Sequence, residues 1–395
     1  RDKVDKIYDT PVFLVANGPS LDVTIETVRA HQGKALIVSL GSAINTLHKY
    51  GITPDLHMEM ERTRPTVNLM NAINDAEYLR KIPLIALNTV HPDVLGFFDE
   101  KYLYCKSYEA GTNLLRSCDD VPYLAEVQFC NPTVSNMGMS VIAALGFREV
   151  YLFGVDLGFP VDKHHSEKSI YYQEDGGDKK LFQIKQSDLT AVEGNFGSEV
   201  MTDYLFGQSA RILALEIEVN EGLKVYNTGH GVKIRMTEPL AHDQIKLKDN
   251  TLLPLVALRQ ALFNTVHNDA AFERQIMDKI HSGDFDRVLD ELVRMNLEPA
   301  TSRYDLMLRV DKQFELVHTL EYSKDMWLAD MIRGSLLYIH SLTQRGIMLP
   351  AAADDAINKY DRLCAVIVDY LEACRAKFHR EIDTPDQTDL GHLWK

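Results

Sequence analysis

The stretch VFLVANGPSLD, residues 12–22, is an apolar run that stops at Asn-Gly-Pro-Ser and continues into a helical pattern. This order predicts a buried strand, a tight loop and a helix. The N–H groups and the positive dipole end at the start of such a helix form a natural seat for phosphate. We therefore expect a nucleotide at this loop, although a turn followed by a capping serine has the same pattern.

The loop differs from both common phosphate-binding motifs. It lacks the G-x-G-x-x-G spacing of dinucleotide-binding folds and the Gly-Lys-Ser/Thr ending of the Walker loop. ATP bound as in Walker-type enzymes is therefore not expected.

The composition is that of a folded, acidic protein. Of 395 residues 45% are hydrophobic, and 42 basic against 57 acidic side chains give a formal charge of −15. This charge opposes binding to nucleic acid or to an anionic membrane, so we expect neither as a partner. No apolar stretch approaches the roughly 20 residues that span a bilayer. The chain starts at Arg1 without a signal-peptide pattern, which indicates a piece excised from a longer chain.

The cysteines exclude two further classes of protein. They are odd in number, widely spaced and form no C-x-x-C pair, so neither a disulfide framework nor a zinc site is indicated. A reducing cytoplasm is the simplest setting. The five are Cys105, Cys118, Cys130, Cys364 and Cys374.

Residues 1–240 read as one α/β domain. Short apolar runs alternate with helical patterns, which predicts a Rossmann-like, mainly parallel sheet covered by helices on both faces. Ligands of such sheets bind at the carboxyl ends of the strands. The expected strands are residues 12–16, 35–39, 84–88, 102–105, 127–130, 150–154 and 223–226.

Between residues 158 and 200 the periodicity fades into a polar stretch that contains HHSEKSIYYQEDGGDKK. Long irregular insertions in compact domains are usually functional or disordered. We interpret 158–200 as a lid over the active site, and Tyr171 and Tyr172 favour this over plain disorder.

Residues 250–395 carry only helical patterns and predict an all-α domain of antiparallel helices. Breaks are expected near 282–283, 298–299 and 349–350. Acceptor docking, self-association and a scaffold that covers the sheet remain open as roles, so a homo-oligomer is allowed.

Polar residues alternate in the segment ITPDLHMEMERTR. Asp55, His57, Glu59 and Glu61 would project from one face of an extended chain. A divalent metal, recognition of ligand hydroxyls, and a structural cluster with Arg62 or Arg64 all remain open. Within the segment we select His57 and Glu59.

Small and polar residues mark the other strand ends. Ser42 follows the second strand, and NPTVSNMG at 131–138 precedes a helix. Asp156 follows the strand at 150–154, where its carboxylate could take a substrate hydroxyl, and an Asn227-Thr228-Gly229 turn ends the last strand. Because the carboxyl ends of parallel strands share one edge, we expect these groups to form one pocket.

The motifs ANGPSLD and SNMGMSVIAALGFREVYLFGVDLGF resemble the bacterial CMP-sialic-acid sialyltransferases. PDLHMEMER and VYNTGHGVKI are similar to the motility associated factor (Maf) proteins, and the resemblance covers residues 10–240. It implies transfer of a nonulosonic acid, such as pseudaminic or legionaminic acid, from its CMP-activated donor to Ser/Thr hydroxyls of flagellin. The function implied is flagellar assembly and motility, without a redox cofactor and with no metal indicated.

The resemblance also implies roles for single residues. The nucleotide-binding loop would be Asn17, Gly18, Pro19 and Ser20, with Ser42 beside it; Glu59 falls near an asparagine of the sialyltransferases. Thr133, Ser135 and Asn136 would line the donor pocket, and Asn227 and Thr228 would complete its rim.

The general base departs from the family pattern. The sialyltransferases place a histidine ahead of the helix that follows the flap, where this chain reads NFGSEVMTDYLFG. His164, His165 and His230 are the candidates. We select His165, and name Glu59 and Asp156 as the other catalytic residues.

Two alternatives remain. The chain also resembles the archaeal hydroxymethylpterin pyrophosphokinase, which would use ATP and magnesium at the 55–61 cluster. A non-catalytic flagellin-binding protein would retain the nucleotide fold without turnover.

Overall fold

A computed structural model describes residues 10–119, 124–159, 165–169, 188–247, 270–349 and 352–387. The chain divides into two compact units. The α/β unit comprises Arg1–Ser107, Ala125–Thr265 and Asp386–Lys395, and the helical unit comprises Tyr108–Leu124 and Val266–Pro385. His164, Tyr171 and Tyr172 lie outside the described residues, and so does most of the expected lid.

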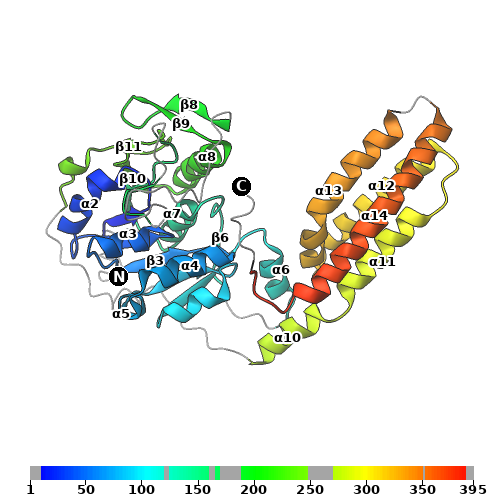
Figure 1. Cartoon of the computed structure of the whole chain (residues 1–395), viewed down its shortest axis with the longest axis horizontal. Helices are drawn as coiled ribbons and strands as arrows, with labels where there is room; N and C mark the ends of the chain where they lie inside the picture. Colours follow the sequence, from blue (N-terminus) through cyan, green and yellow to red (C-terminus); the bar gives the residue numbers. More distant parts are fainter. Residues whose placement is uncertain are drawn as a thin grey trace. The chain divides into compact units, whose positions relative to one another are not determined.

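The α/β unit is built on a parallel sheet of nine strands, as the alternating pattern predicts (Figure 1). The strand order is β11-β10-β7-β1-β2-β3-β4-β5-β6. The strands are β1 (Val12–Val15), β2 (Leu36–Leu40), β3 (Leu56–Glu59), β4 (Leu84–Leu87), β5 (Lys101–Lys106), β6 (Glu126–Val127), β7 (Glu149–Phe153), β10 (Lys224–Asn227) and β11 (Glu238–Pro239).

Both faces of strand β1 are buried, which explains its uninterrupted apolar sequence. Val12 and Leu14 lie in one hydrophobic core, whereas Phe13 and Val15 lie in another. Helices and short 3-10 turns cover the sheet: α2 (Leu21–Ala30), α3 (Ala43–Lys49), α4 (Arg64–Ile73), α5 (Ala76–Lys81), η1 (Pro92–Phe97), α7 (Val134–Ala144), α8 (Tyr204–Val219) and η3 (His242–Gln244).

The direction of the chain across the sheet reverses between β1 and β7. From β1 the chain builds the sheet outward to β6, and then returns to place β7 on the other side of β1. The loops that follow these two strands therefore leave in opposite directions at the carboxyl edge, which is where sheets of this kind bind ligands. The Asn-Gly-Pro-Ser loop follows β1 and Asp156 follows β7, so both lie at this switch point.

A small antiparallel hairpin stands apart from the main sheet. Its strands, β8 (Thr190–Glu193) and β9 (Glu199–Thr202), fall inside the segment where the sequence shows no periodicity. Phe159 and Met201 exchange backbone hydrogen bonds of 2.9 and 3.3 Å, which attach β9 to the chain after β7.

The helical unit contains four long helices that lie side by side (Figure 1). Breaks occur at the three places where the sequence predicts them. A fourth break, at residues 322–325, has neither glycine nor proline and was not predicted. The helices are α10 (Ala270–Ile280), α11 (Asp284–Leu297), α12 (Arg303–Glu321), α13 (Met326–Met348) and α14 (Ala353–Glu381).

One helix of this unit comes from the first third of the sequence. Helix α6 (Ala110–Ser117) packs on α13, and Leu114 joins the apolar core of the unit. The Asn113 amide donates a hydrogen bond of 2.6 Å to Asp330 of α13. The sequence analysis placed α6 within residues 1–240, because contacts across more than 200 residues leave no local signal.

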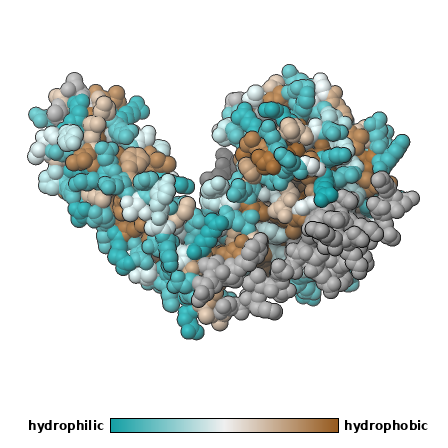
Figure 2. Space-filling view, turned by 180° about the vertical axis from the view of Figure 1, so that it is seen from behind, coloured by the Kyte–Doolittle hydropathy of each residue, from teal (hydrophilic) through white to brown (hydrophobic). Residues whose placement is uncertain are grey.

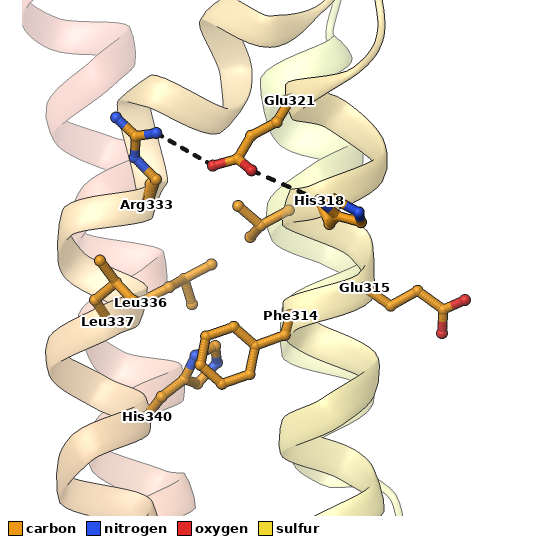
Figure 3. Close-up of a pocket in the computed structure, with 9 residues that line it drawn as sticks. Phe314, Glu315, His318, Glu321, Arg333, Leu336, Leu337 and His340 are labelled. Atoms are coloured by element: carbon orange, nitrogen blue, oxygen red, sulfur yellow. Dashed lines mark hydrogen bonds and ion pairs between the residues drawn. The ribbon is translucent and has the colours of Figure 1, made fainter.

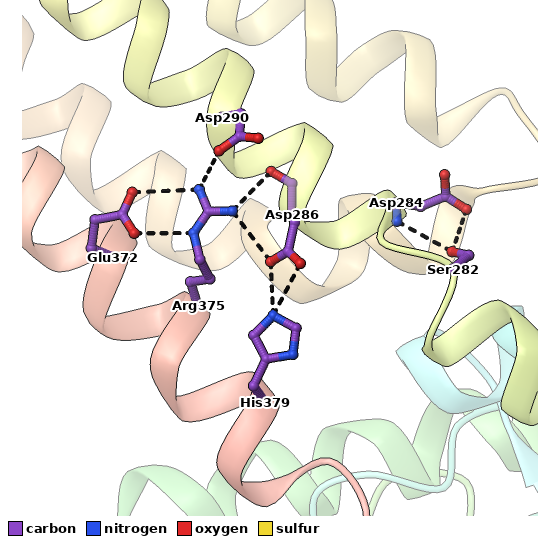
Figure 4. Close-up of polar contacts among 7 residues, drawn as sticks. All are labelled: Ser282, Asp284, Asp286, Asp290, Glu372, Arg375 and His379. Carbon is purple, nitrogen blue, oxygen red and sulfur yellow. Dashed lines mark hydrogen bonds and ion pairs between the residues drawn. The ribbon is translucent and has the colours of Figure 1, made fainter.

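A cluster of charged residues joins α11 to α14 (Figure 4). The Arg375 guanidinium donates to Asp290 at 2.6 Å and lies 3.3 Å from a carboxylate oxygen of Asp286. His379 lies 3.0 Å from the same Asp286 carboxylate. Because these groups are partly exposed, we assign most of the stability of the unit to its apolar core.

No helix among the described residues combines the length and the apolar character that a membrane span requires.

We predict that Leu292→Ala lowers the free energy of unfolding of the helical unit by about 2–5 kcal/mol, because Leu292 is fully buried. Urea unfolding followed by the fluorescence of Trp327, which lies in the same core, measures the effect. Leu297→Ala on the same helix is the control, since Leu297 is 63% exposed. Equal losses in the two variants would contradict this assignment of the core.

Candidate functional site

Asn17 connects three segments at the carboxyl edge of the sheet. Its amide nitrogen donates to the Ser42 hydroxyl at 3.0 Å and to the Ser169 hydroxyl at 2.9 Å. Its amide oxygen accepts from the Thr46 hydroxyl at 2.7 Å. The loops after β1 and β2 therefore lie together, as the sequence analysis expected, and Asn17 itself is only 6% exposed.

Residues 165–169 lie directly against the Asn-Gly-Pro-Ser loop. The Ser166 N–H donates to the carbonyl of Asn17 at 3.0 Å, and the Ser166 hydroxyl donates to Asp22 at 2.5 Å. The Glu167 N–H also donates to Asp22, at 2.9 Å. This contact brings the backbone of His165, the selected general base, beside the predicted nucleotide loop. No sequence signal indicated that Ser166 and Ser169 would be buried here.

Asp156 is held tightly between the loops that follow β1 and β10. One carboxylate oxygen accepts the Ser20 N–H at 2.8 Å. A Cβ atom added at Gly18 would clash with this oxygen, and one added at Gly229 would lie 2.6 Å from the other. Glycine is therefore required at position 18, where the added Cβ would also lie 2.5 Å from the carbonyl oxygen of Gly154, and a Cβ at position 229 would displace the Asp156 carboxylate. Burial raises the pKa of the Asp156 carboxyl above its usual value.

Backbone N–H groups of the Asn-Gly-Pro-Ser loop donate hydrogen bonds to acceptors within the protein. The Gly18 N–H donates to the carbonyl of Gly154 at 2.9 Å, the Ser20 N–H donates to Asp156, and Pro19 has no N–H. The N–H groups of Gly18 and Ser20 are thus occupied. A phosphate bound at this edge needs donors other than these two.

The start of helix α7 offers such donors. The N–H groups of Val134 and Ser135 donate to no group among the described residues, and the positive end of the helix dipole adds to their attraction for an anion. A Cβ atom added at Gly41 would lie 3.2 Å from Val134, so the α7 start meets the turn after β2.

Thr133 and Asn136 stabilise the start of helix α7. The Asn136 side chain accepts from the Thr133 N–H at 3.1 Å and donates to the carbonyl of Ser209 at 3.0 Å. The Ser209 hydroxyl lies 2.9 Å from that of Thr133 and donates to Asn136 at 2.6 Å. With Asn136 1% exposed, this network caps α7 and fixes α8 against it.

Glu59 is a buried carboxyl at the end of β3. One oxygen accepts the N–H groups of Met60 and Glu61 at 2.8 and 3.1 Å. The other lies 4.0 Å from a Cβ atom added at Gly41, next to the α7 start. Burial, with the carboxylate of Glu61, raises the pKa of Glu59 to about 7. The group is therefore poised to exchange a proton near neutral pH.

Two other members of the alternating segment, His57 and Asp55, are structural. His57 is fully buried, lies 2.9 Å from the Ser39 hydroxyl and stacks on Phe98. Burial lowers the pKa of His57 to about 3, so the ring is neutral. Asp55 precedes β3 and accepts the Ile37 N–H at 2.8 Å, away from the carboxyl edge. Among the described residues no three His, Cys, Asp or Glu side chains form a metal-binding group.

The turn after β10 lies at the same edge of the sheet, beside the end of β7. The Thr228 hydroxyl donates to the carbonyl of Leu152 at 2.7 Å, and the Asn227 side chain accepts the Gly229 N–H at 3.0 Å. Asn195, at the tip of the hairpin, donates to the carbonyls of Asn227 and Gly229 at 2.8 and 2.9 Å. Sequence analysis missed Asn195, whose neighbours read as an ordinary Gly-Asn-Phe-Gly turn.

The comparisons with known proteins agree with this fold. The family model of the 6-hydroxymethylpterin diphosphokinase MptE-like proteins matches residues 1–162. A solved Maf glycosyltransferase from Magnetospirillum magneticum AMB-1 superposes with a TM-score of 0.63 at 22% sequence identity. The match covers 93% of this chain and 56% of that one, so this chain spans about half the length of its structural relative. No curated protein matches the sequence.

The likeness to Maf proteins that the sequence motifs indicated is therefore confirmed. This chain has the fold of a Maf glycosyltransferase: a Rossmann-like α/β unit and a helical unit.

We predict that Glu59→Gln makes the protein more stable than the wild type at pH 8 but not at pH 4. The pKa of Glu59 is about 7 in the folded state and 4.5 in the unfolded state. The protonated carboxyl therefore contributes its full stability below pH 4.5, and this contribution is lost as pH rises through about 7. The difference between variant and wild type should therefore grow by up to about 3 kcal/mol across this window.

Urea unfolding at several pH values measures this difference. Glu199→Gln, at an exposed position on β9, is the control and should show no such trend. A difference for Glu59→Gln that does not change with pH would show that the carboxyl has the same pKa in the folded and unfolded states, and would contradict the raised pKa.

Proposed function

We propose that this protein is a glycosyltransferase that moves a nonulosonic acid, pseudaminic or legionaminic acid, from its CMP-activated donor to Ser/Thr hydroxyls of flagellin. The observation that carries the proposal is the set of polar groups gathered at the switch point of a Maf-like fold. Asn17, Ser42, Glu59, Asp156 and the α7 start come from five separate places in the chain and meet at one edge of the sheet. Such edges are where doubly wound sheets bind nucleotides.

In this proposal the phosphate of CMP binds at the start of α7. The unused N–H groups of Val134 and Ser135 and the helix dipole hold its charge. Glu59, protonated in part near pH 7, lies beside this position and can donate a hydrogen bond to the phosphate. The rest of the nucleotide would lie along Asn17, Gly18, Pro19 and Ser42.

The reaction breaks the bond between the anomeric carbon and the phosphate oxygen, and the bonding electrons leave with CMP. An acceptor hydroxyl attacks the oxocarbenium-like carbon from the opposite face, which inverts the anomeric centre. Its proton passes to a base, for which we propose His165 because the 165–169 backbone lies against Asn17. Asp156 would position a donor hydroxyl. The transfer requires no redox cofactor.

We place the reaction in the cytoplasm. All five cysteines are free and four of them are buried, which suits a reducing compartment.

A pterin pyrophosphokinase is the second candidate, because the matching family model bears that activity in its description. It would consume ATP in the presence of magnesium. Release of AMP from ATP with a hydroxymethylpterin substrate, and no release of CMP from a nonulosonate donor, would favour it over the glycosyltransferase.

We predict that Val134→Pro weakens binding of CMP by roughly 10- to 100-fold, because it removes an N–H that bonds a charged phosphate. Proline is tolerated at the first helical position, and the extended backbone of Thr133 (φ −118°, ψ 161°) suits the residue before a proline. The fold should therefore remain intact. Titration calorimetry measures the affinity.

Val134→Ala is the matched control, since it shortens the same side chain but keeps the N–H. If both variants bind CMP alike, the phosphate does not bind at this helix start.

We predict a mass gain of one or more nonulosonate residues when flagellin is incubated with this protein and CMP-pseudaminic or CMP-legionaminic acid. Intact-protein mass spectrometry measures it. His165→Gln should slow the transfer by about 10²- to 10⁴-fold, the usual contribution of a general base. His230→Gln is the control, at a second histidine near Asp156.

A rate that falls with His230→Gln and not with His165→Gln would move the base to the turn after β10. No transfer with either donor, together with no binding of CMP, would reject the glycosyltransferase.

A further inference from the structure

Asp22 joins two segments of the chain that lie 144 residues apart in the sequence. It stands in the first turn of α2, at the end of the ANGPSLD motif, and the reaction proposed above gives it no part. One of its carboxylate oxygens accepts the Ser166 hydroxyl at 2.5 Å, and the other accepts the Glu167 N–H at 2.9 Å. Both donors belong to the segment 165–169 and directly follow His165, the proposed base.

Other contacts hold the same segment in place. The Ser166 N–H donates to the carbonyl of Asn17 at 3.0 Å, and the Ser169 hydroxyl accepts from the Asn17 amide at 2.9 Å. The Lys168 ammonium lies 3.9 Å from the centre of the Tyr50 ring, at the end of α3. Ser166 and Ser169 are fully buried. The segment is therefore fixed to the loop after β1, to the start of α2 and to the end of α3.

Ion pairs on the surface of the helical unit act differently. Hydrophobic side chains lie among polar ones on the surface of this unit (Figure 2). Glu321 lies 3.2 Å from Arg333 in the groove between α12 and α13 (Figure 3). This pair joins the ends of two flexible side chains, which are 26% and 43% exposed. It therefore contributes little stability and fixes no backbone position.

The Asp22 contact, in contrast, restrains the backbone itself. A hydrogen bond from a backbone N–H to a carboxylate fixes the position of the chain, and bonds to an ionised acceptor are roughly twice as strong as those between neutral groups. Without the Asp22 side chain, residues 166 and 167 would lose these hydrogen bonds. The backbone next to His165 would then be held less firmly.

We propose that Asp22 is a positioning residue for His165. By holding residues 166 and 167 against the start of α2, it keeps the backbone of His165 beside the Asn-Gly-Pro-Ser loop. A general base must lie within hydrogen-bond reach of the proton that it takes. A displacement of about 1 Å can lower a rate by roughly 100-fold. This inference rests on the function proposed above, in which His165 accepts the proton of the acceptor hydroxyl.

Asp22→Ala should slow the modification of flagellin by about 10- to 100-fold, the range of a hydrogen bond to a charged group. Mass spectrometry of flagellin over time measures the rate. Titration calorimetry should show little change in the affinity for CMP, because Asp22 is not among the proposed nucleotide contacts. Asp75→Ala is the matched control and should keep the wild-type rate, since Asp75 accepts the Tyr78 N–H at 3.0 Å at the start of another helix of the same unit, α5.

A double-variant cycle separates positioning of the base from general support of the fold. In the His165→Gln background, Asp22→Ala should have almost no further effect, because no base remains to be positioned. An equal fall in both backgrounds overturns the inference, and so does a His165→Gln variant that keeps the wild-type rate. Asp22→Asn keeps one acceptor oxygen and should show an intermediate rate. It replaces the alanine variant in the cycle if that variant does not fold.

Hydrogen–deuterium exchange without any ligand tests the contact apart from the reaction. The peptide that contains Glu167 should exchange faster in Asp22→Ala than in the wild type and in Asp75→Ala. Unchanged exchange overturns the positioning role, and so does an Asp22→Ala variant that modifies flagellin at the wild-type rate. Either result leaves the glycosyltransferase proposal intact. A wild type that neither modifies flagellin nor binds CMP rejects the proposed function, and the positioning role with it.

Discussion

The hydrogen bond from the Ser20 N–H to the Asp156 carboxylate is the contact on which the candidate site depends. It crosses the switch point between β1 and β7 and fixes the start of α2 to the end of β7. The contact is possible because Gly18 and Gly229 have no Cβ to displace the carboxylate. Asp156 thereby takes the position at the α2 start that an anionic ligand takes in many nucleotide-binding folds.

Because of this contact, we expect the phosphate at the start of α7 and not at the start of α2. With the Gly18 and Ser20 N–H groups occupied, the start of α7 is a positive helix end at this edge of the sheet whose first two N–H groups remain unused among the described residues. It lies beside Gly41 and the buried carboxyl of Glu59. A protonated Glu59 favours a bound anion, whereas an ionised one opposes it. For a phosphate bound there, as we propose, binding and the protonation of Glu59 would be coupled, and the affinity for the nucleotide should fall as pH rises above neutrality.

The sequence predicts the middle of the parallel sheet well because strands such as β1, β2 and β4 are buried on both faces and read as apolar runs. Local pattern also finds three of the four breaks between helices α10 to α14, where glycine or proline marks them. It misses the β8–β9 hairpin, whose side chains are mostly exposed and carry no apolar pattern. The packing of α6 with the helical unit rests on contacts such as Asn113 with Asp330, which no local pattern encodes.

The candidate site, too, could be predicted from the sequence only in part. Motifs at the strand ends correctly indicate that Asn17, Ser42 and Asp156 lie at one edge, because topology alone brings them there. Which of their polar atoms are already bonded depends on distant partners, as with Ser169 on Asn17 and Asp156 on Ser20. The burial that neutralises His57 and raises the pKa of Glu59 is likewise a property of the packed fold.

The most direct test of the central claim, that a nucleotide binds at this switch point, is hydrogen–deuterium exchange of the whole chain with and without saturating CMP. The account predicts slower exchange in the peptides that contain residues 16–22, 132–137 and 154–158, and unchanged exchange in α11 to α14. Protection confined to the helical unit, or no protection at a concentration that saturates binding, would contradict it.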